Sequence, residues 1–140
     1  MAAVGQRDAI LDSTMLIHHA RTRNKRNSFF SRSLLVYYPN LSVISIYEIE
    51  FGALRARRAS DIETLQVSFN ILALTEQIAR RAAALEASLV HQNLQIGIKD
   101  TFIAATCLVY DLPLLTVNLR HFNRVEGLQL IELNTLPLIS

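Results

Sequence analysis

Short apolar runs alternate with longer segments of helical periodicity along this chain. Apolar runs bounded by polar or turn-forming residues are typical of buried strands. They predict strands over Ala9–Leu11, Leu41–Ser45, Ile71–Leu74, Leu114–Val117 and Gln129–Leu133. Because helical segments separate most of these runs, the pattern predicts βαβ units, a mainly parallel sheet and a three-layer α/β/α fold.

Apolar residues spaced three and four positions apart predict the helices. These cover about Ser13–Arg23, Phe29–Tyr38, Ile46–Arg58, Ser60–Phe69, Thr75–Val90 and Asp100–Tyr110, and a further helix begins at Asn118. We expect Pro39 to stop the second helix. Ser45 and Glu48 match a capping box that opens the third helix.

The predicted helix from Asp100 to Tyr110 is apolar on nearly every side, so it is expected to be buried. Its first residue is a carboxylate. Ionised carboxylates are seldom buried unless they are paired, cap a helix or hold a cation. Asp100 therefore needs a partner of one of these kinds.

Composition narrows the class of protein. With 140 residues, of which 51% are hydrophobic, the chain is long enough to bury a core, and we expect a single domain over residues 1–140. No apolar run reaches the roughly 20 residues that span a bilayer, and there is no secretory leader, so we expect a cytoplasmic protein without membrane contact. The one cysteine, Cys107, excludes an internal disulfide and is expected to be buried.

The net charge is only +2, but the basic residues are unevenly distributed. Five of them lie between positions 21 and 32, and three more lie between positions 55 and 58. Basic clusters attract phosphates, so a nucleic-acid ligand is compatible with this pattern. Solvated helix ends and loops explain each cluster equally well.

Polar residues follow the predicted strands at the points where helices begin. Asp12 and Asn118 lie at such junctions, Glu48 lies just inside a helix, and Asp100 starts another. In a parallel sheet these positions meet at the carboxyl ends of the strands, where ligands bind. Each residue taken alone is explained at least as well by a helix-capping role, the commonest use of Asp and Asn before a helix.

Three carboxylates at one edge of a sheet repel one another unless a cation lies among them. An all-oxygen ligand set suits Mg²⁺ or Mn²⁺. The sequence has no Cys/His spacing for zinc, no glycine-rich phosphate loop and no Ser-His-Asp set. Bound Mg²⁺ polarises a phosphoryl oxygen and generates hydroxide from water, which is the chemistry of phosphodiester hydrolysis.

Four ordered segments resemble the motifs of PIN domains. Ile10–Thr14 resembles the first motif, in which an aspartate ends the first strand, and Ile44–Gly52 resembles the second, a glutamate with a glycine four residues later. Asp100–Ala105 is similar to the third motif and Leu115–Phe122 to the fourth. The resemblance covers nearly the whole chain and is closest to the VapC-type toxins of bacterial toxin–antitoxin pairs.

The resemblance implies a small PIN-like endoribonuclease that depends on Mg²⁺, with Mn²⁺ as an alternative ion. It also implies an RNA substrate, a VapB-type antitoxin as partner and a homodimer. Asp12, Glu48 and Asp100 carry over as the acidic catalytic core. His121 stands where the fourth motif often has an acidic residue, so Asn118 or His121 is expected to act through hydrogen bonds or water.

Roles follow from these positions. We expect Asp12 and Asp100 to ligate the metal directly, and Glu48 to ligate it or to position the attacking water. Contacts to phosphate or RNA are expected from Ser13, Thr14, Lys99, Arg120 and Arg124. Helix capping for the two hydroxyl residues and solvated charge for the three basic residues are equally good explanations.

Tyr47, Phe51 and Leu54 share one face of a predicted helix. This face serves either the core or a groove for an apolar segment of a partner, and the resemblance favours an antitoxin there.

Two other classes of function stay open. A PIN-like protein with a degenerate site, suggested by His121, would bind a partner without catalysis. A phosphoacceptor receiver-like module also carries acidic residues at a parallel sheet edge. Such a module needs adjacent acidic residues after the first strand and a lysine after a late strand, and this sequence has neither.

Overall fold

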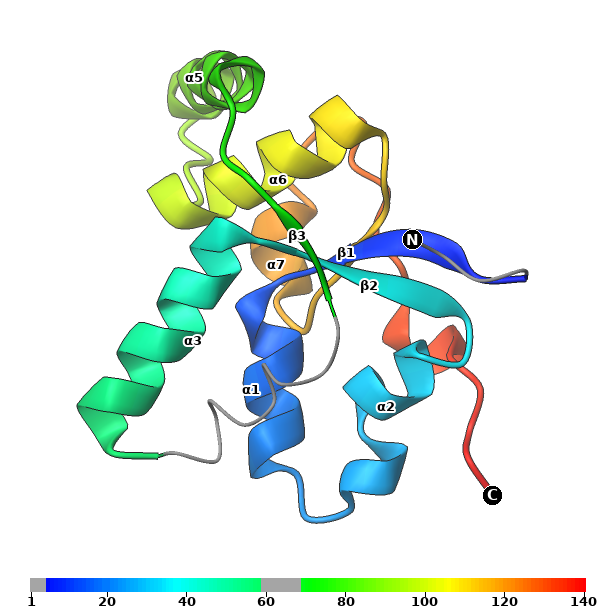
Figure 1. The fold of residues 1–140 in the computed structure, drawn as a ribbon. Coiled ribbons are helices and arrows are strands. Elements are labelled where there is room, and N and C mark those ends of the chain that lie inside the picture. The colour runs from blue at the N-terminus through cyan, green and yellow to red at the C-terminus, as the bar shows by residue number, and fades with distance from the viewer. Residues whose placement is uncertain (1–4, 59–68) are drawn as a thin grey trace.

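The computed structural model describes residues 5–58 and 69–140. Its centre is a four-stranded sheet with the order β3-β2-β1-β4, in which every pair of neighbours is parallel (Figure 1). The strands are β1 (Arg7–Leu11), β2 (Tyr37–Ser42), β3 (Asn70–Leu72) and β4 (Leu114–Leu115). The predicted parallel sheet is confirmed.

Helices cover both faces of this sheet, which confirms the predicted three-layer α/β/α fold (Figure 1). One side carries α1 (Ser13–Arg21), α2 (Phe29–Ser33) and α3 (Val43–Ala56). The other side carries α5 (Glu76–His91), α6 (Ile98–Tyr110) and α7 (Leu119–Phe122). Short 3-10 turns lie at Lys25–Asn27 and Leu133–Thr135.

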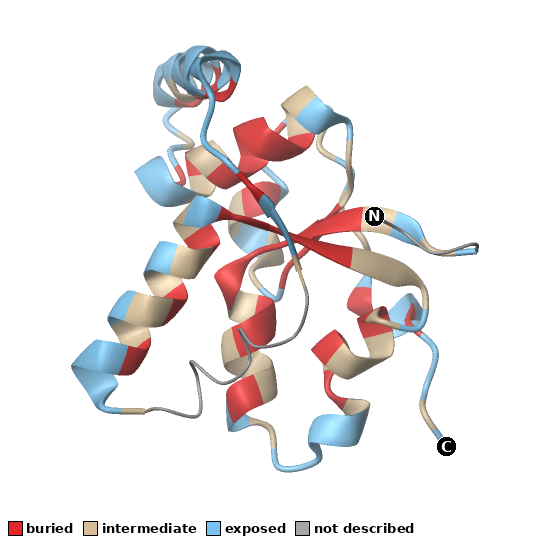
Figure 2. Cartoon of the chain, in the orientation of Figure 1, coloured by how far each residue is buried: buried red, intermediate tan, exposed pale blue. Residues whose placement is uncertain are grey.

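Alternating side chains of β1 supply both halves of the core. Ile10 packs with Ile103 of α6 on one face of the sheet, whereas Ala9 and Leu11 pack with Met15 of α1 on the other. All five residues are fully buried, and Figure 2 shows buried residues along the central strands and the inner sides of the helices. The period of two in the strand is what lets one apolar run serve two layers.

The expectation for Cys107 is confirmed, since this residue is buried in α6. Among the described residues, no helix combines the length and the apolar character that crossing a bilayer requires.

The predicted helix Phe29–Tyr38 is too long. α2 ends at Ser33, and β2 begins at Tyr37 with Pro39 inside the strand. Proline lacks an N–H for the hydrogen-bond ladder. The strand accommodates it because, among the described residues, β2 pairs with β3 only from Asn40 onward, beyond Pro39.

The predicted capping box at Ser45 is wrong. Ser42 is the N-cap of α3, and its hydroxyl accepts a hydrogen bond from the Ile44 N–H at 3.1 Å. Ser45 lies inside the helix, fully buried, and its hydroxyl has no hydrogen-bond partner within the described part of the chain. The strand before α3 therefore ends at Ser42, and Glu48 does not cap the helix.

Other boundaries differ from the prediction by a few residues. α6 begins at Ile98, so Asp100 lies in its first turn rather than at its start. β4 is shorter than predicted, and the predicted last strand is reduced to an isolated bridge between Leu130 and Leu114. The predicted helix Ser60–Phe69 lies, except for its last residue, outside the described residues.

Candidate active site

Asp12 lies directly after β1 and is the N-cap of α1. One of its carboxylate oxygens, Oδ1, accepts hydrogen bonds from the N–H and the hydroxyl of Thr14. The other, Oδ2, accepts a 2.7 Å bond from the hydroxyl of Thr116, which follows β4. Asp12 is only 2% exposed. It is a helix cap and a buried acidic group at once, so the two interpretations of the sequence do not exclude each other.

Burial raises the pKa of Asp12 from 3.8 to about 6. Hydrogen bonds from Thr14 and Thr116 lower this pKa and so offset part of the effect. The negative charges of Asp100 and Glu48 raise it further. A buried carboxylate that is repelled by two neighbours gains from a cation placed among them.

Glu48 reaches the same region from α3. The Ser13 hydroxyl donates a hydrogen bond to Glu48 Oε1 at 3.1 Å, and Lys99 Nζ lies 4.0 Å from Oε2. Burial is the main cause that raises the pKa of Glu48, and Asp100 adds to the rise, while Ser13 and Lys99 lower it. Glu48 is therefore in contact with the start of α1 and the start of α6.

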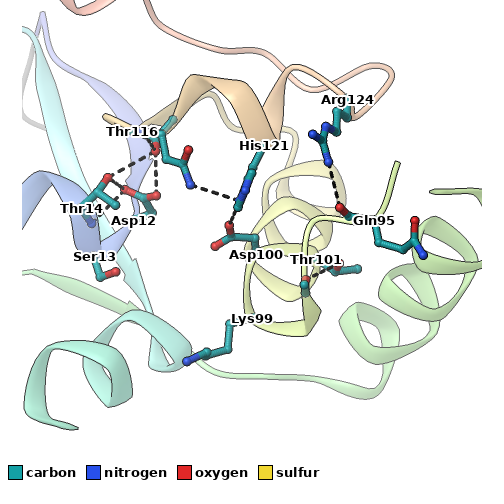
Figure 3. A network of polar contacts seen from close by, with 12 residues as sticks. Asp12, Ser13, Thr14, Gln95, Lys99, Asp100, Thr101, Thr116, His121 and Arg124 are labelled. Carbon is teal, nitrogen blue, oxygen red and sulfur yellow. Dashed lines mark hydrogen bonds and ion pairs between the residues drawn. The ribbon is translucent and has the colours of Figure 1, made fainter. Parts of the chain in front are cut away.

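Asp100 enters from the first turn of α6 (Figure 3). Its Oδ2 lies 2.9 Å from Nδ1 of His121, and the same ring nitrogen lies 3.1 Å from Nδ2 of Asn118. Asn118 precedes α7, but its side chain makes no capping bond. The third and fourth sequence motifs thus meet through a direct contact between Asp100 and His121.

The three carboxylates come from distant segments and still act on one another electrostatically. Figure 3 shows Asp12 and Asp100 in one polar network, together with Thr116 and His121. Each carboxylate has donors of its own, and the described residues contain no group of three His, Cys, Asp or Glu side chains arranged to hold a metal as they stand. The fold brings the predicted residues to one region without forming a closed ligand shell.

The chemistry of these donors fits a hard divalent cation. Asp12, Glu48 and Asp100 offer carboxylate oxygens, the ligands that Mg²⁺ and Mn²⁺ prefer. Cys107 does not offer a soft thiolate ligand, because burial and the negative charge of Asp12 raise the pKa of its thiol. A divalent ion would also relieve the repulsion between the carboxylates.

Thr116 is a site residue that sequence reasoning missed. It is fully buried, donates to Asp12 and accepts a 2.9 Å hydrogen bond from the N–H of Asn118. Its hydroxyl therefore links the first motif to the fourth. The available signal was its position immediately after an apolar run and two residues before Asn118.

The basic residues predicted to contact phosphate lie in different environments. Lys99 is beside Glu48, with Nζ 5.8 Å from the centre of the Tyr47 ring. Arg124 Nη1 donates to the Gln95 carbonyl at 2.9 Å and so supports the loop before α6 (Figure 3). Arg120 is exposed on α7, next to His121 in sequence.

The helix face formed by Tyr47, Phe51 and Leu54 is not part of the core. These residues are 55%, 50% and 69% exposed, respectively. The rings of Tyr47 and Phe51 stack with their centres 5.9 Å apart. Of the two uses left open by the sequence, the exposed apolar side chains favour an interface.

Comparison with known proteins shows the family. The sequence model of the PIN domain matches residues 9–128 of this chain. Ribonuclease VapC10 of Mycobacterium tuberculosis is 32% identical over 120 residues, which cover 86% of this chain and 90% of that protein. VapC ribonuclease PF0355 of Pyrococcus furiosus is 31% identical over 136 residues, covering 94% of this chain and 86% of the relative.

Solved structures agree with this result. The structure of VapBC-1 from nontypeable Haemophilus influenzae matches with a TM-score of 0.72 and 25% identity, covering 90% of this chain and 98% of that chain. VapBC2 from Rickettsia felis, bound to a DNA fragment from its promoter, matches with a TM-score of 0.75 at 19% identity, covering 88% and 96%. The chain therefore belongs to the PIN domain family and, within it, is a relative of the VapC ribonucleases.

Proposed function

We propose that this protein is a Mg²⁺-dependent endoribonuclease that hydrolyses phosphodiester bonds in RNA and acts as the toxin of a toxin–antitoxin pair. The observation that supports this most is that Asp12, Glu48 and Asp100 lie close enough to interact electrostatically. This closeness is seen in the pKa of Asp12, which the negative charges of Glu48 and Asp100 raise. The curated relatives are themselves named VapC ribonucleases. Mn²⁺ is the alternative ion, since it accepts the same oxygen ligands.

The bound ion would supply Lewis-acid activation of the scissile phosphate and of a water molecule. Asp12 and Asp100 are proposed as its direct ligands. Glu48 is proposed to complete the ligand set or to accept a proton from the attacking water. Burial raises the pKa of Glu48, which makes its carboxylate a stronger base than an exposed glutamate.

The neighbouring side chains are proposed to hold these carboxylates in place. Thr116 fixes Asp12, Ser13 fixes Glu48, and His121 fixes Asp100. Removing a group that orients a metal ligand typically costs about 10- to 100-fold in metal affinity or activity. Lys99 and the exposed Arg120 are proposed to attract the RNA backbone.

The exposed face of α3 is proposed to bind a VapB-type antitoxin. Several solved relatives are structures of VapBC, and another is a toxin–antitoxin complex. Tyr47, Phe51 and Leu54 present an exposed apolar strip at helical spacing, which suits an amphipathic segment of a partner. A homodimer is a further expectation from the family resemblance.

The direct test is cleavage of RNA in Mg²⁺ by the wild type and by Asp12→Asn, Asp100→Asn and Asp111→Asn. Asp111 is the matched control, because it is exposed at the other end of α6 with a φ of 54°, a conformation that Asn also adopts. The first two variants should cleave at least about 100-fold more slowly, and the control should match the wild type.

Wild-type cleavage by either site variant, or undiminished cleavage in EDTA, would contradict the proposal. Absence of both cleavage and Mg²⁺ binding at millimolar metal would instead favour a partner-binding protein with a degenerate site. Incorporation of a phosphoryl group from a small phosphodonor, seen by intact mass, would favour the receiver-like alternative.

A further inference from the structure

A cavity of about 520 Å³ lies beside the candidate active site along α1. Its lining includes Thr14, Ile17, His18, Arg21, Val117 and Asn118. Two of these residues border the acidic group, because Thr14 donates to Asp12 and Asn118 contacts His121. The cavity therefore adjoins the candidate active site through these two residues, while the three carboxylates themselves do not line it. Its volume is in the range that holds small organic ligands.

The α1 side of the cavity follows from helix geometry. Thr14, Ile17, His18 and Arg21 stand at steps of three and four residues, so they share one face of the helix. With a rise of 1.5 Å per residue, Thr14 and Arg21 lie about 10 Å apart along the axis. The wall thus runs from Thr14, which contacts Asp12, to the cation of Arg21.

The middle of this wall is flat and partly apolar. The His18 ring stacks on Phe29, with ring centres 4.8 Å apart and planes 25° apart. Phe29 holds the His18 ring through this stacking contact and is not among the residues that line the cavity. Ile17 and the exposed Val117 add apolar surface. A planar, supported ring beside aliphatic groups is a surface on which a nucleobase stacks.

The far end of the cavity carries a cation. Arg21 is the last residue of α1 and is exposed, and its side chain makes no hydrogen bond or ion pair with any residue in the described part of the chain. A guanidinium in this position has all its donors available for a phosphate. Lys99 also lies beside stacked aromatic rings, those of Tyr47 and Phe51, but these belong to the exposed face of α3 that is proposed to bind the antitoxin.

We propose that this cavity is a nucleotide subsite of the RNA strand, in which the base next to the scissile phosphate stacks on His18 and the following phosphate binds Arg21. The inference rests on the proposed ribonuclease function and adds a binding site for the nucleotide next to the scissile phosphate. His18 and Arg21 are binding residues here, since neither reaches the acidic carboxylates through a hydrogen bond.

The test uses the full chain carrying Asp12→Asn to prevent cleavage, and a fluorescein-labelled, eight-nucleotide single-stranded RNA in Mg²⁺. In this background, His18→Ala and Arg21→Gln should each weaken binding about tenfold by fluorescence anisotropy. Arg21→Gln should also reduce the slope of log K against log salt by about 0.7. The controls are His91→Ala and Arg81→Gln, which remove the same groups from exposed positions on α5.

His18→Ala removes a ring that stacks on Phe29, so a second measurement covers the case in which this variant does not fold. The RNA is made with 4-thiouridine, irradiated with the Asp12→Asn protein and digested, and the crosslinked peptide is identified by mass spectrometry. Crosslinks to residues 17–22 support the subsite, even if cleavage by the wild type is not detected. Crosslinks elsewhere, together with unchanged RNA binding by Arg21→Gln, overturn the proposed subsite. That outcome is expected if the cavity binds a protein partner instead of RNA.

The same variants in the wild-type background separate the two proposals. If the wild type cleaves RNA and Arg21→Gln cleaves it with unchanged kcat/KM, the ribonuclease assignment stands and the subsite does not.

Discussion

Asp12 combines a structural role with a proposed catalytic one in a single side chain. As the N-cap of α1 it satisfies backbone and hydroxyl donors, and as a buried carboxylate it offers charge to a cation. Its pKa of about 6 means that the folded chain binds this proton more tightly than the unfolded chain does. Folding therefore favours the protonated form, whereas ligation of a metal needs the ionised one.

This conflict predicts how stability depends on pH in EDTA. A raised carboxylate pKa gives stability that is complete below the unfolded value, 3.8, and is lost as pH rises through about 6. The difference between these values corresponds to about 3 kcal/mol for Asp12. We expect Asp12→Asn to exceed the wild type in free energy of unfolding at pH 8, and to lose most of that advantage near pH 4.

Urea denaturation at pH 4, 6 and 8 measures this difference. Asp111→Asn, at an exposed position, is the control and should follow the wild type at each pH. An advantage of Asp12→Asn that does not change with pH would mean that the buried carboxylate is not the source of the effect.

His121 is predicted to act on the metal site through Asp100. Its Nδ1 lies 2.9 Å from Asp100 Oδ2, so removing the ring leaves that carboxylate without its described donor. We expect His121→Ala to lower Mg²⁺ affinity or RNA cleavage by about tenfold, a typical loss for a group that orients a ligand. His91→Ala, on an exposed end of α5, is the control for loss of an imidazole. Unchanged affinity and cleavage in His121→Ala would remove this role.

The types and order of the residues were enough to predict that Asp12, Glu48 and Asp100 come together. They were not enough to predict that Thr116 contacts Asp12. Asp12 and Asp100 stand out because carboxylates beside apolar runs need an explanation. A threonine after a strand needs none, since its hydroxyl is satisfied in many ways. Only the pairing of β1 with β4 reveals that Thr116 donates to Asp12, from 104 positions away.

At the scale of elements, the start of α3 gives a direct comparison of two serines. Ser42 caps the helix, whereas the buried Ser45 hydroxyl has no partner within the described residues. Ser42→Ala should lower the free energy of unfolding by about 1 kcal/mol, the usual value of an N-cap. Ser45→Ala should raise it by about 1 kcal/mol, because an unsatisfied hydroxyl no longer has to be buried.

Thermal or urea unfolding of the two variants measures both effects. The two substitutions are the same, Ser to Ala, and lie three residues apart. The reverse order, with Ser45→Ala the more damaging, would restore the capping box that the sequence suggested.

Helix and strand boundaries were predicted least well where apolar segments adjoin. The run from Phe29 to Tyr38 has too few polar residues to mark where α2 ends and β2 begins. Pro39 can stop a helix, but its fixed φ also suits a strand where the neighbouring pairing has not begun. By contrast, α5 was predicted closely, because Ile78, Ala82, Leu85 and Leu89 form one regular buried stripe.

At the scale of the whole molecule, the parallel sheet explains the site. β1 lies between β2 and β4, so its carboxyl end is flanked by the starts of the helices and loops that follow its neighbours. Asp12 and Thr116 therefore become adjacent, and Glu48 follows β2 on the next helix. The alternation of strands and helices was visible in the sequence, which is why both the fold and the meeting of these residues could be predicted.

Side-chain directions could not be predicted from that alternation. Glu48 turns toward Ser13 and Lys99, and Asp100 turns toward His121, according to which donors lie within reach. Those donors come from other elements, so they depend on packing rather than on local pattern.

The most direct measurement of the central claim is calorimetric titration of Mg²⁺ into the wild type, Asp12→Asn, Asp100→Asn and the control Asp111→Asn at pH 7.5. We predict saturable binding by the wild type and the control, and at least about tenfold weaker binding by each of the other two variants. Binding by Asp12→Asn and Asp100→Asn that equals the wild type would contradict a shared metal site.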